Sequence, residues 1–177
     1  KNCAALVDDG DCIQMGIGAL PNALAAQLRH HKNLGLHTEM FADGLLTLIK
    51  AGVINGSHKK IDTGKVVASF LLGSNDVYSF INDNPMVLMK DIKYTNDPWV
   101  IAQNPNMKAI NSATEVDLTG QISADSIGTR IFSGTGGQLE FVRGATMSKG
   151  GKSITAFASR TNKGQNKIVA QLNPGAG

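Results

Sequence analysis

The chain is 177 residues long, which suits a single domain with a substantial core. Hydrophobic residues make up 42% of it and charged residues 18%, with a net charge of +3 and no long run of like charges, which argues against a disordered chain and against a nucleic-acid-binding face. No apolar stretch of about 18 residues occurs, so no membrane-spanning helix is expected.

The two cysteines, Cys3 and Cys12, are too few for a disulfide framework and form no CxxC pair. We therefore expect a reducing compartment, the cytoplasm, and no metal site. The chain shows no signal-peptide pattern at its start. It opens on KNCAALV as if within a helix and stops at NPGAG without a terminal helix. We expect both ends to be cut from a longer protein.

Short apolar runs of strand type alternate along the chain with amphipathic helical segments. This pattern predicts an α/β fold with an open, largely parallel sheet flanked by helices. Strands are expected at residues 12–17, 34–38 and 66–72. The third run is apolar throughout, which is typical of a central strand buried on both faces.

Helices are expected between and after these strands. The segment ALPNALAAQL places Pro21 in a first turn, where its missing N–H costs nothing. Asp43 begins the helical pattern LLTLIKAG, which Gly52 is placed to end. SNDVYSFINDN follows the third strand, with Ser74 or Asn75 as its N-cap.

The second half of the chain has a different sequence pattern, with more turn signals and glycines. Residues 94–107 are rich in turn signals, and we expect them to cover the edge of the sheet or to form the wall of a cleft. KAINSATEVDL, KSITAFAS and KIVAQL predict three further strands, with a glycine-rich stretch between the first two. Without repeats or linkers, residues 1–177 are expected to form one domain.

The segment GLHTEMFADG, residues 35–44, holds the first candidate for chemistry. Glu39 directly follows a predicted strand, at the carboxyl end, where α/β sheets bind their ligands. A glutamate carboxylate is ionised at neutral pH and can act as a nucleophile without a base. The spacing alone leaves two alternatives open: a charge at a helix N-terminus, or a solvated turn.

The stretch SGTGGQ, residues 133–138, precedes the helical pattern LEFVRGATM. Glycines let backbone N–H groups approach an anion, and the start of a helix favours negative charge. The spacing fits neither a dinucleotide-binding loop nor a P-loop. The same N–H groups could form an oxyanion hole for acyl transfer, or the stretch could be only a tight turn.

Five further residues are ambiguous on the sequence alone. Gly16 and Gly18 lie in a loop that either touches a substrate or makes a close strand-to-helix turn, and the neighbouring Gln14 needs a partner if it is buried. Lys149, in SKGGK, contacts the phosphates of a ligand or lies in a solvated turn. His37 is expected to be a core histidine with a satisfied hydrogen bond rather than a catalytic base.

Five blocks of the sequence resemble the family of 4-hydroxybutyrate and acetate CoA-transferases and the related acetyl-CoA hydrolases. They are GIGALPNALAAQL, LGLHTEMFADG, HKKIDTGKVVASFLLGSNDVYSFINDNPMV, INSATEVDLTGQISADSIGTR and SGTGGQLEFVRGATMSKGGKSI, in family order over essentially the whole chain. The resemblance implies the C-terminal CoA-transferase domain of a two-domain enzyme. The N-terminal domain and a C-terminal extension would then be absent, and little activity is expected of this chain alone.

The resemblance also implies roles for particular residues. In that family the glutamate of the HTEM-type motif is the nucleophile, here Glu39, which forms a glutamyl-CoA thioester by covalent catalysis with ping-pong kinetics. Gly136 is the expected oxyanion donor. The expected contacts to the acyl group and CoA are Gln14, Gly16, Gly18, Met40, Gly134, Gly137, Gln138 and Lys149.

The function implied is an acyl-CoA:carboxylate CoA-transferase acting on short-chain acids such as acetate, butyrate or 4-hydroxybutyrate. Coenzyme A is then a substrate, and neither a metal nor a redox cofactor is required. The expected partners are the protein's own N-terminal domain and a second copy in a homodimer, with no nucleic acid and no membrane. The alternatives are an acetyl-CoA hydrolase with the same nucleophile, a non-catalytic CoA-binding or assembly module, and a sugar-phosphate isomerase, against which the HTEM and SGTGGQ blocks argue.

Overall fold

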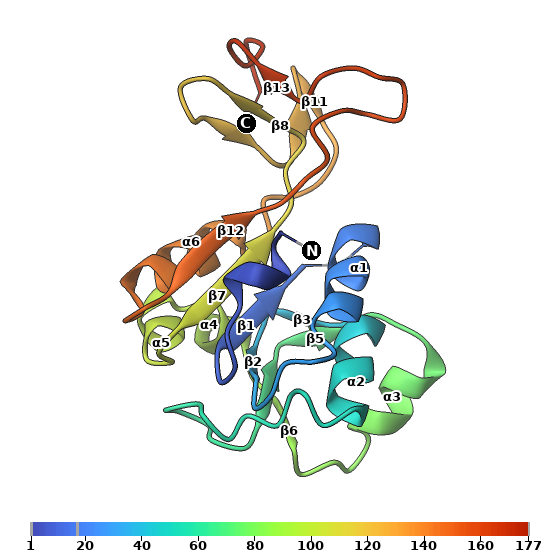
Figure 1. Cartoon of the computed structure of the whole chain (residues 1–177), viewed down its shortest axis with the longest axis vertical. Helices are drawn as coiled ribbons and strands as arrows, with labels where there is room; N and C mark the ends of the chain where they lie inside the picture. The colour runs from blue at the N-terminus through green and yellow to red at the C-terminus, as the bar shows by residue number, and fades with distance from the viewer. Residues whose placement is uncertain (1, 17, 177) are drawn as a thin grey trace.

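The central sheet in the computed structural model, which describes residues 2–16 and 18–176, is built from six parallel strands (Figure 1). Their spatial order is β12-β7-β1-β2-β4-β6. The predicted open, parallel α/β sheet is therefore confirmed. The strands are β1 (Cys12–Met15), β2 (Gly35–His37), β4 (Val66–Ala68), β6 (Val87–Met89), β7 (Met107–Asn111) and β12 (Lys152–Thr155).

The chain changes direction across the sheet next to β1. From β1 it builds outward on one side through β2, β4 and β6, and it then returns to place β7 and β12 on the other side of β1. In open α/β sheets, the crevice at the carboxyl ends of the strands on either side of such a reversal is where ligands bind. The carboxyl ends of β1 and β7 are therefore the first place to look for a site.

Helices cover both faces of the sheet (Figure 1). On one face lie α1 (Ala19–Gln27), α2 (Asp43–Lys50) and α3 (Asn75–Ile81). On the other lie α4 (Ile92–Thr95), α5 (Pro98–Ala102) and α6 (Gln138–Met147), and one 3₁₀ turn, Ala4–Leu6, precedes β1. Among the residues described, no helix is long and apolar enough to cross a membrane.

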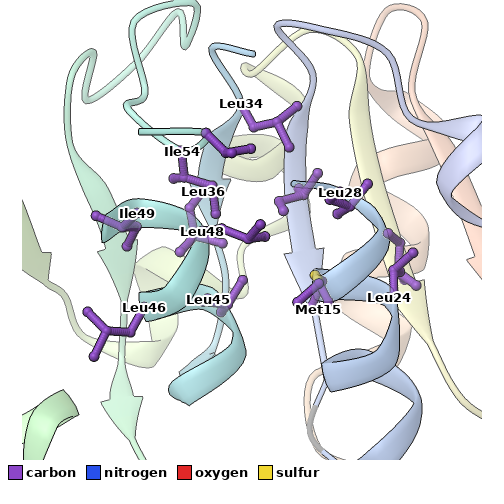
Figure 2. Close-up of a cluster of buried hydrophobic side chains, with 14 of the residues drawn as sticks. Met15, Leu24, Leu28, Leu34, Leu36, Leu45, Leu46, Leu48, Ile49 and Ile54 are labelled. Atoms are coloured by element: carbon purple, nitrogen blue, oxygen red, sulfur yellow. The ribbon is translucent and has the colours of Figure 1, made fainter. Parts of the chain in front are cut away.

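Two hydrophobic clusters hold these layers together. The larger packs α1 and α2 on the sheet through residues such as Leu24, Leu28 and Leu48 (Figure 2). The smaller joins α5 and α6 to β7 through Ile101, Met107 and Phe141, among others. Complete burial of side chains of this size contributes roughly 1.5–3 kcal/mol each, so the sheet is fixed from both sides.

The predicted strand at 66–72 is correct only in its first half. Val66, Val67 and Ala68 form buried β4, but after Ser69 the chain leaves the sheet. Residues Phe70–Leu71 form a separate strand, β5, which pairs with β3 (Met40–Phe41). Phe70 is 45% exposed, so the second half is not buried on both faces. Apolar composition alone cannot show where a strand leaves its sheet.

The turn-rich segment also differs from its prediction, because it contains the short helices α4 and α5. Asp91 and Asp97 cap them, since each side chain accepts a hydrogen bond from the backbone N–H two residues later, at 2.8 Å. Helix α5 packs on α6, and its Ile101 is buried with Cys12 of β1 and Met107 of β7, so the segment lies on one face of the sheet and does not cover its edge (Figure 1). Met107, at the end of the segment, begins β7.

A β-rich extension projects from the α/β body beyond β7 and β12 (Figure 1). It contains a three-stranded sheet of β8 (Glu115–Asp117), β9 (Ile122–Ser123) and β13 (Ile168–Val169), and a hairpin of β10 (Ser126–Ile127) and β11 (Arg130–Ile131). The Asp117 carboxylate accepts hydrogen bonds from Thr119, Gln121 and the Leu172 backbone, led by the Thr119 hydroxyl, which together hold its pKa below the usual range. Asp117 thereby ties the C-terminal segment to the β8–β9 turn.

Candidate active site

A hollow of about 390 Å³ lies at the carboxyl ends of β1, β2 and β7, beside the reversal point of the sheet. Segments far apart in the chain meet there: the end of β1, the residues after β2, the end of β7 and the glycine loop, residues 133–137, before α6. Most of the residues expected from the sequence line it together. These are Gln14, Gly16, Glu39, Met40, Gly134, Gly136, Gly137 and Gln138.

Glu39 is held in place through its backbone. Its carbonyl oxygen accepts hydrogen bonds from the N–H groups of Ser69 and Phe70, at 2.9 and 3.2 Å. The preceding Thr38 is fully buried, and its hydroxyl is placed to donate to the carbonyls of Met15 and Met40. Glu39 therefore sits on a rigid link between β2 and β3, with its side chain in the hollow.

The Glu39 carboxylate meets the glycine loop directly. Its Oε2 accepts a hydrogen bond from the Gly137 N–H at 2.9 Å, although the two residues are 98 positions apart in the chain. Gly137 directly precedes α6, whose N-terminus carries partial positive charge. A Cβ on Gly137 would lie 2.4 Å from this Oε2, a distance that forces movement. Glycine is therefore required at position 137 for the contact.

The buried side-chain amide of Gln14 is hydrogen-bonded to the side-chain amide of Asn111. Its Nε2 donates to Oδ1 of Asn111 at 3.2 Å, and Nδ2 of Asn111 donates back to its Oε1 at 3.3 Å. The two amides stand on the neighbouring strands β1 and β7, and both line the hollow. Asn111 was not predicted. Its only signal in the sequence is a polar residue at the end of an apolar strand.

Asn96 is a second residue that the sequence did not reveal. Its Nδ2 would lie 2.3 Å from a Cβ at position 137, so it stands directly beside the glycine loop. Hydrogen bonds orient the Asn96 side chain. Its Oδ1 accepts from the Thr95 hydroxyl at 3.2 Å, and the Thr95 hydroxyl also contacts the hydroxyl of Ser69. The turn-rich segment gave no pattern from which this position could be chosen.

His37 is a core residue, as the sequence predicted. It is fully buried, its Nε2 lies 2.9 Å from the Thr95 carbonyl, and this distance requires an N–H on Nε2. Burial lowers the pKa of His37 to about 4, so the ring is neutral at physiological pH. A neutral donor facing a carbonyl positions the segment that carries Asn96 and has no proton to exchange with a substrate.

The depressed pKa makes a prediction for the acid stability of the fold. In the unfolded chain His37 has a pKa of about 6.5 and binds a proton below that pH, whereas in the folded protein it stays neutral until the pH approaches 4. The contribution of His37 to the free energy of unfolding is therefore complete above pH 6.5 and falls by about 3 kcal/mol as the pH drops toward 4. In an NMR titration the His37 ring should stay neutral down to about pH 5. A midpoint near 6.5 would contradict this arrangement.

Two expected contact residues lie outside the hollow. Gly18 precedes α1 with φ +107° and ψ −171°, a backbone conformation that glycine alone adopts readily, so its conformation accounts for the glycine. Lys149 follows the far end of α6, about 15 Å along the helix from Gly137, where its carbonyl accepts a hydrogen bond from Asn106. The structure does not bring Lys149 together with Glu39.

Within residues 2–16 and 18–176, no group of three or more His, Cys, Asp or Glu side chains is arranged to hold a metal ion. Burial raises the pKa of the Cys12 thiol to about 12, so this cysteine is not poised as a nucleophile. Among the described residues that line the hollow, Glu39 is the one ionisable side chain, and no histidine lies among them to activate the hydroxyl of Ser112 or Ser133.

The sequence profile of the acetyl-CoA hydrolase/transferase C-terminal domain matches residues 73–177. The chain belongs to this family. The expected family resemblance is thereby confirmed, and the glycine loop lies within the matched range.

Curated members of the acetyl-CoA hydrolase/transferase family are similar over nearly the whole chain. The 4-hydroxybutyrate coenzyme A transferase of Clostridium kluyveri is 49% identical over 99% of this chain and 41% of its own length. The succinyl-CoA:acetate/propanoyl-CoA:succinate CoA transferase of Fasciola hepatica is 52% identical over 97% of this chain and 36% of its own. The chain thus spans about 40% of the length of these relatives.

A solved structure supports the fold of this family member. RipA from Yersinia pestis superposes with a TM-score of 0.91 at 42% identity, covering 97% of this chain and 39% of RipA. The α/β body and the β-rich extension therefore both belong to a fold already seen in a related protein.

Proposed function

We propose that the full-length protein containing this chain is an acyl-CoA:carboxylate CoA-transferase with Glu39 as its nucleophile. The observation that carries the proposal is the Glu39 carboxylate in the hollow, with its Oε2 bonded to the Gly137 N–H at 2.9 Å. The names of the two curated relatives, both CoA transferases, support the same reaction.

The first half-reaction converts Glu39 into a thioester. A carboxylate oxygen of Glu39 attacks the acyl carbon of acyl-CoA, and the carbon–sulfur bond breaks to leave an acyl-glutamyl anhydride and CoA thiolate. The thiolate then attacks Cδ of Glu39. The bond from Cδ to the bridging oxygen breaks, which releases the original acid as a carboxylate and leaves a glutamyl-CoA thioester.

The second half-reaction runs the same steps in reverse with a new acid. The acceptor carboxylate attacks Cδ and expels CoA thiolate, which attacks the acyl carbon of the resulting anhydride. The products are a new acyl-CoA and free Glu39. No net proton is taken up, which agrees with a site whose buried histidine is held neutral.

Each attack on Cδ places negative charge on the carboxyl oxygen of Glu39 that stays bound to it. The Gly137 N–H already lies 2.9 Å from Oε2, so we assign Gly137 as a donor to this oxyanion beside the expected Gly136. Removing one good oxyanion donor typically costs about 2.7–4 kcal/mol of transition-state stabilisation. A hollow of about 390 Å³ that opens on Glu39 suits a short-chain acyl group.

The test is the dependence of turnover on an acceptor acid. With acetyl-CoA and butyrate, the full-length protein should form butyryl-CoA with ping-pong kinetics, measured by chromatography of the CoA thioesters. Free CoA released at the same rate with and without butyrate would instead identify an acetyl-CoA hydrolase. Acetyl-CoA left intact under both conditions would contradict the proposed activity.

A further inference from the structure

The short strands β3 and β5 lie side by side (Figure 1) and contribute one wall of the hollow that contains Glu39. Met40 of β3 and Phe70 of β5 are partners in this parallel pair, and both line the hollow. Successive side chains of a strand point to opposite faces of a sheet, and paired residues share a face. Met40 and Phe70 therefore stand next to each other on the face that is turned toward the hollow.

The opposite face of this strand pair is packed into the protein. Phe41 is fully buried, and its ring stacks on Phe80 of α3 with the ring centroids 6.3 Å apart. Leu71 packs against the same hydrophobic cluster. The core thus holds the pair from behind, and the apolar side chains of its other face are presented to the hollow.

Phe70 is also fixed relative to the proposed nucleophile. Its backbone N–H donates to the Glu39 carbonyl at 3.2 Å, and the next turn of the pairing places the Leu72 N–H on the Phe41 carbonyl at 3.0 Å. The Phe70 side chain nevertheless remains 45% exposed. A large apolar side chain that is held beside a reactive group and left half exposed is typical of a surface that an apolar ligand covers.

The charge of the hollow narrows the kind of ligand. Glu39 is its one ionisable residue among those described, so within the described residues no cationic side chain is placed there to meet a second carboxylate. The polar lining residues, such as Gln14, Asn111 and Gln138, come from other segments than Met40 and Phe70. The wall made by β3 and β5 is therefore an apolar side of the site.

We infer that the acyl chain of the substrate packs on the side chain of Phe70, and that Phe70 makes the site favour acids with an apolar chain. The carbonyl carbon must lie at Glu39, and the carbons beyond it extend along the wall from Met40 to Phe70. Acetate is too short to gain much from this contact, whereas butyrate has two more methylene groups. The inference rests on the proposed CoA-transferase function.

The experiment uses competition between acceptor acids in the full-length protein. Propionyl-CoA is the CoA donor, and acetate, butyrate and succinate are supplied together at equal concentrations. The initial ratio of the new acyl-CoA products, measured by chromatography, equals the ratio of kcat/KM for the acids. This ratio does not depend on how much of a variant is folded.

Phe70→Ala should lower the ratio of butyryl-CoA to acetyl-CoA by about tenfold, because one methylene group in an apolar pocket changes kcat/KM by roughly 10- to 200-fold. Phe70→Leu, which keeps the position apolar, should retain most of the ratio. Phe70→Arg places a guanidinium group where the far end of the chain lies. It should therefore raise the ratio of succinyl-CoA to butyryl-CoA by about tenfold or more.

Tyr78→Ala and Tyr78→Arg are the matched controls. Tyr78 is an exposed aromatic residue of α3 that does not line the hollow, so both ratios should stay those of the unmodified protein. An unchanged ratio of butyryl-CoA to acetyl-CoA in Phe70→Ala would overturn the inference, even if total turnover fell. A ratio that rises would also overturn it, because Phe70 would then block the chain.

Failure of this inference and failure of the proposed function give different results. If the unmodified protein makes butyryl-CoA but the product ratios are the same in Phe70→Ala and Phe70→Arg, only the role of Phe70 falls. If the unmodified protein makes no new acyl-CoA from any of the acids, the transferase proposal itself falls, and the role of Phe70 falls with it.

Discussion

Replacing Glu39 by glutamine should reduce the CoA-transfer rate of the full-length protein by roughly three orders of magnitude or more. The amide has nearly the same size and can still accept a hydrogen bond from Gly137, but it cannot attack an acyl-CoA to form an anhydride. The measurement is kcat for acetyl-CoA and butyrate. The loss should appear in kcat, because the shape of the hollow is retained.

Two controls separate loss of chemistry from loss of structure. The melting temperature of Glu39→Gln should match that of the unmodified protein, since the backbone bonds from Ser69 and Phe70 to position 39 do not involve the side chain. Asp43→Asn removes a carboxylate a few residues away that is bonded to Ser74 and does not line the hollow, so turnover should persist. If Glu39→Gln kept a tenth of normal turnover, Glu39 would not be the nucleophile.

Replacing Gly137 by alanine should lower the rate by about 100-fold or more. The added Cβ would lie 2.4 Å from Oε2 of Glu39 and 2.3 Å from Nδ2 of Asn96, so the carboxylate or the loop must move. A misplacement of about 1 Å at a reacting group can cost about 100-fold. The rate of forming the Glu39 adduct, measured in a single turnover, should fall together with kcat.

Gly134→Ala provides the comparison for this prediction. Gly134 lies in the same loop and lines the same hollow, but a Cβ there meets nothing within 4 Å. Its substitution should cost much less activity than Gly137→Ala. Equal losses in the two variants would mean that the whole loop, and not the contact between Gly137 and Glu39, controls the rate.

The sequence predicted those parts of the fold that depend on local patterns. The apolar runs gave β1 and β2, Asp43 and Gly52 marked the limits of α2, and Glu39 was placed at the carboxyl end of a strand. Of the two N-cap candidates, Ser74 and Asn75, Ser74 occupies the N-cap position of α3, but its hydroxyl donates to Asp43 and does not cap its own helix. Periodicity and cap residues report local backbone geometry, which explains this success.

What the sequence did not show depends on contacts between distant segments. The strand predicted at residues 66–72 breaks at Ser69 because the Ser69 and Phe70 N–H groups bond to the Glu39 carbonyl, which no local pattern records. The approach of Gly137 to Glu39 spans 98 positions. Asn96 and Asn111 enter the site through the packing of α4 and the pairing of β1 with β7. Only the folded sheet brings these residues together.

The most direct test of the proposed mechanism is mass spectrometry of the full-length protein after incubation with acetyl-CoA in the absence of an acceptor acid. The protein would be quenched in acid, digested and searched for a CoA adduct on the peptide that contains Glu39. The mechanism predicts an adduct on Glu39 that added butyrate discharges and that is absent from Glu39→Gln. An unmodified Glu39 peptide in protein that leaves acetyl-CoA intact would contradict covalent catalysis at this site.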